Sequence, residues 1–133
     1  MFAALPLILC SVFSLAYSYN LLSEFSLFGP FTKFDNDGIR TYPGWKLGGH
    51  AALQENFLRL TNDRQSKRAS VWCGTRLGLD DWSTTFRFRI SGQGKRLFGD
   101  GLALWYTNKE THQDGDLHGF TNTFTGFGII FDT

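Results

Sequence analysis

Residues 82–90 read WSTTFRFRI, and this stretch alternates between two kinds of side chain with a period of two. Because successive side chains of a β-strand point to opposite faces, the alternation sorts them into two sets. One face carries Trp82, Thr84, Phe86, Phe88 and Ile90, and the other carries Ser83, Thr85, Arg87 and Arg89. The pattern predicts a half-buried strand with one face in solvent.

Short apolar runs elsewhere predict further strands, separated by clusters of turn-forming residues. The expected strands cover residues 21–28, 51–54, 57–61, 70–73, 101–107 and 127–132. Two of the turn clusters are Asp35-Asn36-Asp37-Gly38 and Ser91-Gly92-Gln93-Gly94. Many short strands without a helical period predict an all-β fold, built as an antiparallel β-sandwich.

The composition narrows the class of molecule and its partners. With 133 residues the chain is long enough for one domain with a hydrophobic core. Fourteen phenylalanines and four tryptophans beside 15 glycines favour strands and turns over helices. The formal net charge is +1, so the charge balance points neither to nucleic acid nor to an acidic membrane surface. We therefore expect no nucleic-acid partner.

The first 18 residues differ from the rest of the chain. Residues 1–18 contain no charged side chain and end in the small-x-small pattern Ala16-Tyr17-Ser18, which predicts a secretory signal peptide and a mature chain of residues 19–133. The run is short for a membrane span, which needs about 20 apolar residues, although an uncleaved anchor stays open as an alternative. Cleavage would remove Cys10 and leave Cys73 alone, which excludes a disulfide framework.

Two carboxylates stand at the ends of apolar runs. Asp100 lies between Gly99 and Gly101 immediately before Leu102-Ala103-Leu104-Trp105-Tyr106, and Asp132 follows the apolar run 126–131. A carboxylate at the mouth of a buried strand must be hydrated, hydrogen-bonded or bound to a cation, because burying a bare charge is costly. Flanking glycines let the backbone adopt unusual conformations and let a ligand come close. A tight turn with a solvated Asp100 is the alternative interpretation.

Several motifs, taken in order, carry a family resemblance. They are Arg59-Leu60-Thr61, Gln65-Ser66-Lys67, Ser70-Val71-Trp72, Asp81-Trp82, Phe88-Arg89-Ile90, Gly92-Gln93-Gly94, the run from Gly99 to Tyr106, and Gly128-Ile129-Ile130-Phe131-Asp132-Thr133. Together they resemble the L-type lectins of the early secretory pathway, the mannose-binding cargo receptors that cycle between endoplasmic reticulum and Golgi. The resemblance runs from about Glu24 to Thr133. It is somewhat greater to the vesicular integral membrane lectin branch than to the intermediate-compartment branch.

The resemblance implies a fold and a set of site residues. The family fold is a jelly-roll sandwich of the concanavalin and legume-lectin kind, in agreement with the predicted strands. By resemblance, Asp100 matches the carboxylate that accepts hydrogen bonds from mannose hydroxyls, and Ser66 matches a nearby polar contact to the sugar. Asp132 matches the first Ca²⁺ ligand, in keeping with the oxygen donors that this hard cation requires.

The resemblance also implies partners and a location. The expected partners are high-mannose N-glycans on glycoproteins that leave the endoplasmic reticulum, and the expected location is the lumen of the endoplasmic reticulum, the intermediate compartment and the Golgi. Family domains resemble the large all-β domains of about 200–250 residues, so the chain matches the first half of one, without the family's stalk and membrane anchor. We therefore expect a truncated domain, and a fragment that keeps the strands but lacks a working site is the alternative function.

A sandwich glycoside hydrolase is the enzymatic alternative. Such an enzyme needs two carboxyl groups that flank one glycosidic bond. The only glutamates are Glu24, Glu55 and Glu110, which are scattered along the chain. The histidines His50, His112 and His118 lack the spacing of a zinc site. We therefore expect a binding protein and no enzyme.

Overall fold

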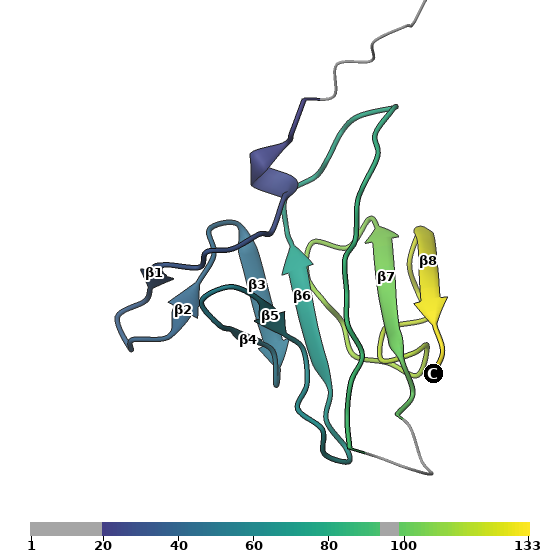
Figure 1. Cartoon of the computed structure of the whole chain (residues 1–133). Helices are drawn as coiled ribbons and strands as arrows, with labels where there is room; N and C mark the ends of the chain where they lie inside the picture. Colours follow the sequence, from purple (N-terminus) through teal and green to yellow (C-terminus); the bar gives the residue numbers. More distant parts are fainter. Residues whose placement is uncertain (1–19, 94–98) are drawn as a thin grey trace, which may run out of the picture.

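Antiparallel pairs of short strands organise the computed structural model, which describes residues 20–93 and 99–133 (Figure 1). Within these ranges the strands are β1 (Lys33–Phe34), β2 (Arg40–Thr41), β3 (Trp45–Gly49), β4 (Ala52–Leu53), β5 (Leu58–Arg59), β6 (Ala69–Cys73), β7 (Leu102–Thr107) and β8 (Gly126–Phe131). They pair as β1–β2, β3–β6, β4–β5 and β7–β8. The predicted all-β fold is confirmed, whereas the predicted signal peptide at 1–18 lies outside the described residues.

The turn predicted at residues 35–38 joins β1 to β2. Its first carboxylate organises it, because Oδ1 of Asp35 accepts hydrogen bonds from the backbone N–H groups of Asp37 and Ile39 at 3.0 and 2.8 Å. Gly38 takes a φ of +75°, a left-handed conformation that favours glycine. The predicted turn is therefore confirmed, and it closes a hairpin whose two short strands were not predicted.

The β7–β8 pair shows how the apolar side chains are sorted. Its register sets Leu102, Leu104 and Tyr106 opposite Phe131, Ile129 and Phe127. Cross-strand partners lie on the same face of a sheet, so these six side chains share one face. On the other face the ring of Trp105 lies over Gly128, where an added Cβ would collide with the indole. Glycine at position 128 is thus the residue that lets a tryptophan pack against the strand.

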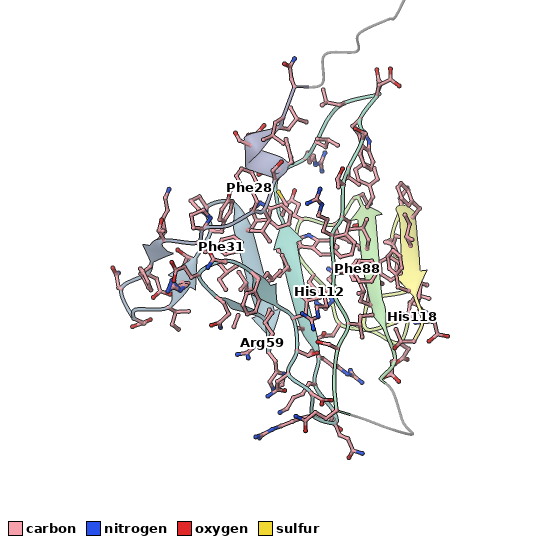
Figure 2. The ribbon with its side chains drawn as sticks, in the orientation of Figure 1. Phe28, Phe31, Arg59, Phe88, His112 and His118 are labelled. Carbon is pink, nitrogen blue, oxygen red and sulfur yellow. The ribbon has the colours of Figure 1, made fainter. Side chains whose placement is uncertain are left out.

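The segment 82–90 forms a second layer over the first face of β7–β8. Trp82 lies 4.8 Å from Tyr106 and 6.5 Å from Phe127 between ring centroids, and Phe88 lies 4.7 Å from Phe131. Figure 1 shows this segment running lengthwise between β6 and β7, and Figure 2 labels Phe88 there. Trp82, Phe86 and Phe88 contact β7–β8 from the predicted apolar face, but all of residues 82–90 are exposed. The predicted half-buried strand is therefore wrong, because no described strand lies beside the segment to form a ladder.

The loop 108–125 covers the opposite face and supplies the central side chain of the core. Phe120 is fully buried, with ring centroids 5.2 Å from Trp72 on β6 and 5.1 Å from Trp105 on β7. Nε1 of Trp72 donates a hydrogen bond to the carbonyl of Lys109 at 3.1 Å, which fastens the start of the loop. Among the described residues, the other buried hydrophobic side chains are Phe31 and Leu53.

Several element predictions need correction. Residues 21–28 hold the 3-10 turn η1 (Ser23–Phe25) and no strand. The expected strands at 51–54 and 57–61 shorten to the two-residue β4 and β5. β3 was not predicted, because Lys46 and the pair Gly48-Gly49 interrupt its apolar pattern. Among residues 20–93 and 99–133, no helix has the length and apolar character that crossing a bilayer requires.

Candidate functional site

The two predicted carboxylates are brought together at one end of the β7–β8 pair. The register pairs Leu102 with Phe131, and its continuation by one residue sets Gly101 opposite Asp132. The hydroxyl of Thr133 donates a hydrogen bond to the carbonyl of Gly99 at 2.6 Å, so the two backbones stay side by side beyond the strands. The backbones at Asp100 and Asp132, 32 positions apart in the sequence, therefore lie at the same end of the strand pair, and both residues are exposed.

Gly101 makes this close approach possible. Its φ is +108°, in a region that L side chains rarely adopt. A Cβ at this position would collide with the carbonyl oxygen of Phe131 and would lie 3.1 Å from Cα of Asp132. Gly99, by contrast, faces open space with nothing within 4 Å of an added Cβ. The two glycines therefore have different roles. The backbone requires a glycine at position 101, whereas Gly99 leaves open space beside Asp100.

Ser66 lies on the exposed loop between β5 and β6, with a φ of +58°. The turn after β3 holds this loop, since the backbone N–H of His50 donates to the carbonyl of Arg68 at 2.9 Å. The His50 ring lies against the same loop, with Nδ1 3.0 Å from that carbonyl and Nε2 3.2 Å from Nζ of Lys67. A carbonyl only accepts and an ammonium only donates, so these partners fit a neutral imidazole protonated at Nδ1.

A further carboxylate joins this loop to the end of the aromatic segment. Oδ2 of Asp63 accepts a hydrogen bond from the backbone N–H of Gln93 at 2.6 Å. Figure 1 shows the β5–β6 loop, residues 91–93, the start of β7 and the end of β8 at the same, lower end of the molecule. The three predicted site residues therefore lie at one end, although among the described residues no hydrogen bond joins Ser66 to Asp100 or Asp132. Sequence reasoning missed Asp63 and His50, because their roles depend on partners 18 to 30 positions away.

The donor atoms at this end match a hard cation in kind. Asp132 and Asp100 bring carboxylate oxygens and Thr133 a hydroxyl, the donors that Ca²⁺ prefers. The number of donors is small, because Ca²⁺ takes about six to eight oxygens. Within residues 20–93 and 99–133, no group of three or more His, Cys, Asp or Glu side chains is placed to hold a metal ion. The side chains of Asp100, Asp132 and Thr133 match Ca²⁺ in donor type, and they would supply only part of the coordination shell of such an ion.

The site is an open surface. Two open hollows of the described structure, of about 480 and 360 Å³, lie by η1 and the β1–β2 hairpin and beside β3 and β4. Neither is lined by Ser66, Asp100 or Asp132. A ligand at Asp100 would therefore rest on an exposed strand end and would contact groups on its surface.

Three similar proteins stand out in comparison with known sequences. The bovine (Bos taurus) VIP36-like protein is 44% identical over 90 residues, which cover 67% of this chain and 26% of that protein. The canine (Canis lupus familiaris) vesicular integral-membrane protein VIP36 is 36% identical over 117 residues, covering 87% and 32%. The murine (Mus musculus) protein ERGIC-53 is 34% identical over 110 residues, covering 83% and 20%.

These relatives are much longer than the region they share with this chain, which spans between a fifth and a third of their length. No solved structure matches the chain significantly. The model of the legume-like lectin family matches residues 18–133, which includes every strand described above and the end that carries Ser66, Asp100 and Asp132. On this match and these relatives, the chain belongs to the legume-like lectin family.

Proposed function

We propose that this chain is a glycan-binding segment of a lectin of the early secretory pathway, and that it recognises high-mannose N-glycans on glycoproteins through Asp100 and Ser66. The membership in a lectin family supports a binding role over an enzymatic one. The observation that carries the proposal is the close approach of the backbone at Gly101 to that of Phe131 and Asp132, which brings Asp100 and Asp132 to one end of β7–β8. Both residues are exposed, so their carboxylates are accessible to sugar hydroxyls, water or a cation.

Asp100 would act as the acceptor for sugar hydroxyls. An ionised carboxylate offers two oxygens that only accept hydrogen bonds, and a pair of adjacent hydroxyls on a hexose offers two donors. Hydrogen bonds to a charged group contribute about 1.5–3 kcal/mol each, more than neutral ones. The open space at Gly99 leaves a sugar ring free to approach. Ser66 would add a hydroxyl from the neighbouring loop.

Asp132 would hold Ca²⁺, and the bound ion would supply positive charge that orders the oxygen-bearing loops around the sugar. With few protein donors at this end, water must complete the coordination shell, and the affinity for Ca²⁺ is expected at about millimolar or weaker. The affinity for one mannose residue is expected to be correspondingly weak. Binding should therefore be measured on a surface that presents many glycans, where multivalent contact raises the apparent affinity.

The second candidate function is a structural or interaction segment of such a lectin without glycan binding. The observation that favours it is the shortage of metal donors among the described residues. Retention on high-mannose glycans separates the two candidates. If the chain binds glycans, it would act in the lumen of the endoplasmic reticulum and Golgi, where its glycoprotein ligands are.

The test compares three forms of the mature chain on immobilised high-mannose glycan, with Ca²⁺ and with a chelator. Asp100→Asn keeps the shape of the side chain and removes its charge, so we expect retention to fall about tenfold or more. Asp116→Asn is the control, because Asp116 is also an exposed aspartate and lies in the loop 108–125. Equal retention of Asp100→Asn and the unmodified chain, at equal melting temperatures, would contradict the assignment. No retention of the unmodified chain would favour the second candidate.

A further inference from the structure

Residues 60–68 join β5 to β6, and this loop, here called the Ser66 loop, is attached at two places. Near its end, the carbonyl of Arg68 accepts a hydrogen bond from the backbone N–H of His50 at 2.9 Å and lies 3.0 Å from Nδ1 of the His50 ring. Near its start, Oδ2 of Asp63 accepts a hydrogen bond from the backbone N–H of Gln93 at 2.6 Å. Ser66 therefore lies between two attachments to other parts of the chain.

The backbone conformation of Ser66 needs such support. Its φ of +58° lies in the left-handed region, which residues other than glycine adopt infrequently. A residue in a sparsely populated conformation keeps it only where the surrounding structure determines it. Ser66 is exposed, so packing around its own side chain contributes little. The attachments on either side of Ser66 are the contacts that hold it.

The turn at residues 91–93 fits closely around the Asp63 carboxylate. A Cβ added at Gly92 would lie 2.8 Å from Oδ1 of Asp63 and 3.1 Å from Oδ2. A side chain at position 92 would collide with the carboxylate, so glycine there lets Asp63 reach the N–H of Gln93. Hydrogen bonds from a backbone N–H to a carboxylate are shorter and stronger than those between neutral groups, and the observed 2.6 Å is short.

We propose that Asp63 is a positioning residue for glycan recognition, which acts through Ser66. Its hydrogen bond to Gln93 fixes the Ser66 loop and thereby places the Ser66 hydroxyl for a sugar bound at Asp100. Figure 1 shows the Ser66 loop, residues 91–93 and the start of β7 at the same end of the molecule. Without the bond, the loop would have to become ordered on binding, which lowers affinity. The inference rests on the proposed function and adds to it a residue that itself touches no sugar.

The order of the Ser66 loop is measured first, on the mature chain without glycan or Ca²⁺. In Asp63→Ala, the backbone order parameter of Ser66 from ¹⁵N relaxation should fall from about 0.85, typical of rigid backbone, to below about 0.6. Asp63→Asn should keep the loop ordered, because the amide oxygen still accepts a hydrogen bond. Unchanged order of Ser66 in Asp63→Ala would overturn the inference, whatever the chain binds.

Gly92→Ala tests the same contact from the other side. The new Cβ displaces the carboxylate while Asp63 stays in the sequence, so this variant should loosen Ser66 as Asp63→Ala does. Asp116→Ala, at an exposed aspartate in the loop 108–125, is the matched control and should leave the order of Ser66 unchanged. Equal loosening in the control would show a general effect of losing an aspartate and would overturn the inference.

Retention on immobilised high-mannose glycan with Ca²⁺ then tests the route through Ser66, among variants of equal melting temperature. Asp63→Ala should lower retention about three- to tenfold, the effect of having to order one or two side chains on binding, and Asp63→Asn should restore most of it. In a Ser66→Ala chain, Asp63→Ala should cause no further loss, because the two residues act as one unit. A further loss would mean that Asp63 acts on the sugar by another route, and would overturn the inference.

The two measurements separate this inference from the proposed function. If Asp63→Ala loosens Ser66 while the unmodified chain is not retained on glycan, the glycan assignment is wrong and Asp63 still fixes the loop. If the unmodified chain is retained and Asp63→Ala leaves both order and retention unchanged, the glycan assignment stands and the positioning role of Asp63 is wrong.

Discussion

At the scale of single residues, the backbone conformation of Gly101 decides whether the candidate site can form. The sequence predicts the importance of the Gly-Asp-Gly unit, because such glycines flank a charged residue before a strand. Which glycine is indispensable could not be predicted, since the answer depends on how closely Phe131 passes, 30 positions further along the chain. The hydrogen bond from the backbone N–H of Gln93 to Asp63 could not be predicted either, because the two residues are 30 positions apart in the sequence.

The different surroundings of Gly99 and Gly101 predict different effects of alanine on stability. Gly101→Ala should lower the free energy of unfolding by about 1–3 kcal/mol, because alanine at a positive φ is strained and its Cβ meets the Phe131 carbonyl. Gly99→Ala should have little effect, because an added Cβ there meets open space. Urea denaturation of both variants measures the difference. Equal stabilities would show that the two backbones do not approach as described.

At the scale of elements, apolar runs predict strands well where a partner strand is present. β6, β7 and β8 lie within or next to residues that the pattern indicates. The segment 82–90 has the clearest alternation of the chain but no ladder. Alternation shows which side chains share a face, whereas a strand also needs hydrogen-bonding neighbours. The sequence of β3 has a weak apolar pattern, yet the segment forms a strand because β6 pairs with all five of its residues.

Hydrogen exchange tests this distinction between a shared apolar face and a hydrogen-bonded backbone. Backbone amides of β7 that bond to β8 should exchange slowly, whereas amides of residues 82–90 should exchange at rates close to those of exposed loops. The measurement is exchange followed by mass spectrometry at a concentration where the chain is monomeric. Protection of residues 82–90 equal to that of β7 would mean that they form a ladder after all.

At the scale of the whole molecule, the sequence predicts the fold class but not its centre. Strands, turns and the absence of a helical period are local properties, so they are readable from neighbouring residues. The central position of Phe120 is not local, because its contacts Trp72 and Trp105 come from two different strand pairs. Nothing around Phe120 in the sequence distinguishes it from the chain's other phenylalanines.

Truncation of the Phe120 side chain should therefore destabilise both the β3–β6 pair and the β7–β8 pair. Phe120→Ala should lower the free energy of unfolding by about 3–5 kcal/mol, the usual effect of removing a buried aromatic ring. Phe28→Ala is the control, at a position that is 52% exposed, and should have a small effect. Thermal melting followed by circular dichroism compares them. A Phe120 variant as stable as the control would place the core elsewhere.

The indole of Trp105 above Gly128 has an evolutionary consequence. Because the ring occupies the space of the missing side chain, position 128 can gain a side chain only when position 105 loses its tryptophan. Mutations at the two positions are then conditional on each other, and each is deleterious in the background that keeps the other residue. Lineages of this family that carry the pair should inherit it as a unit, and those that changed it should have changed both positions.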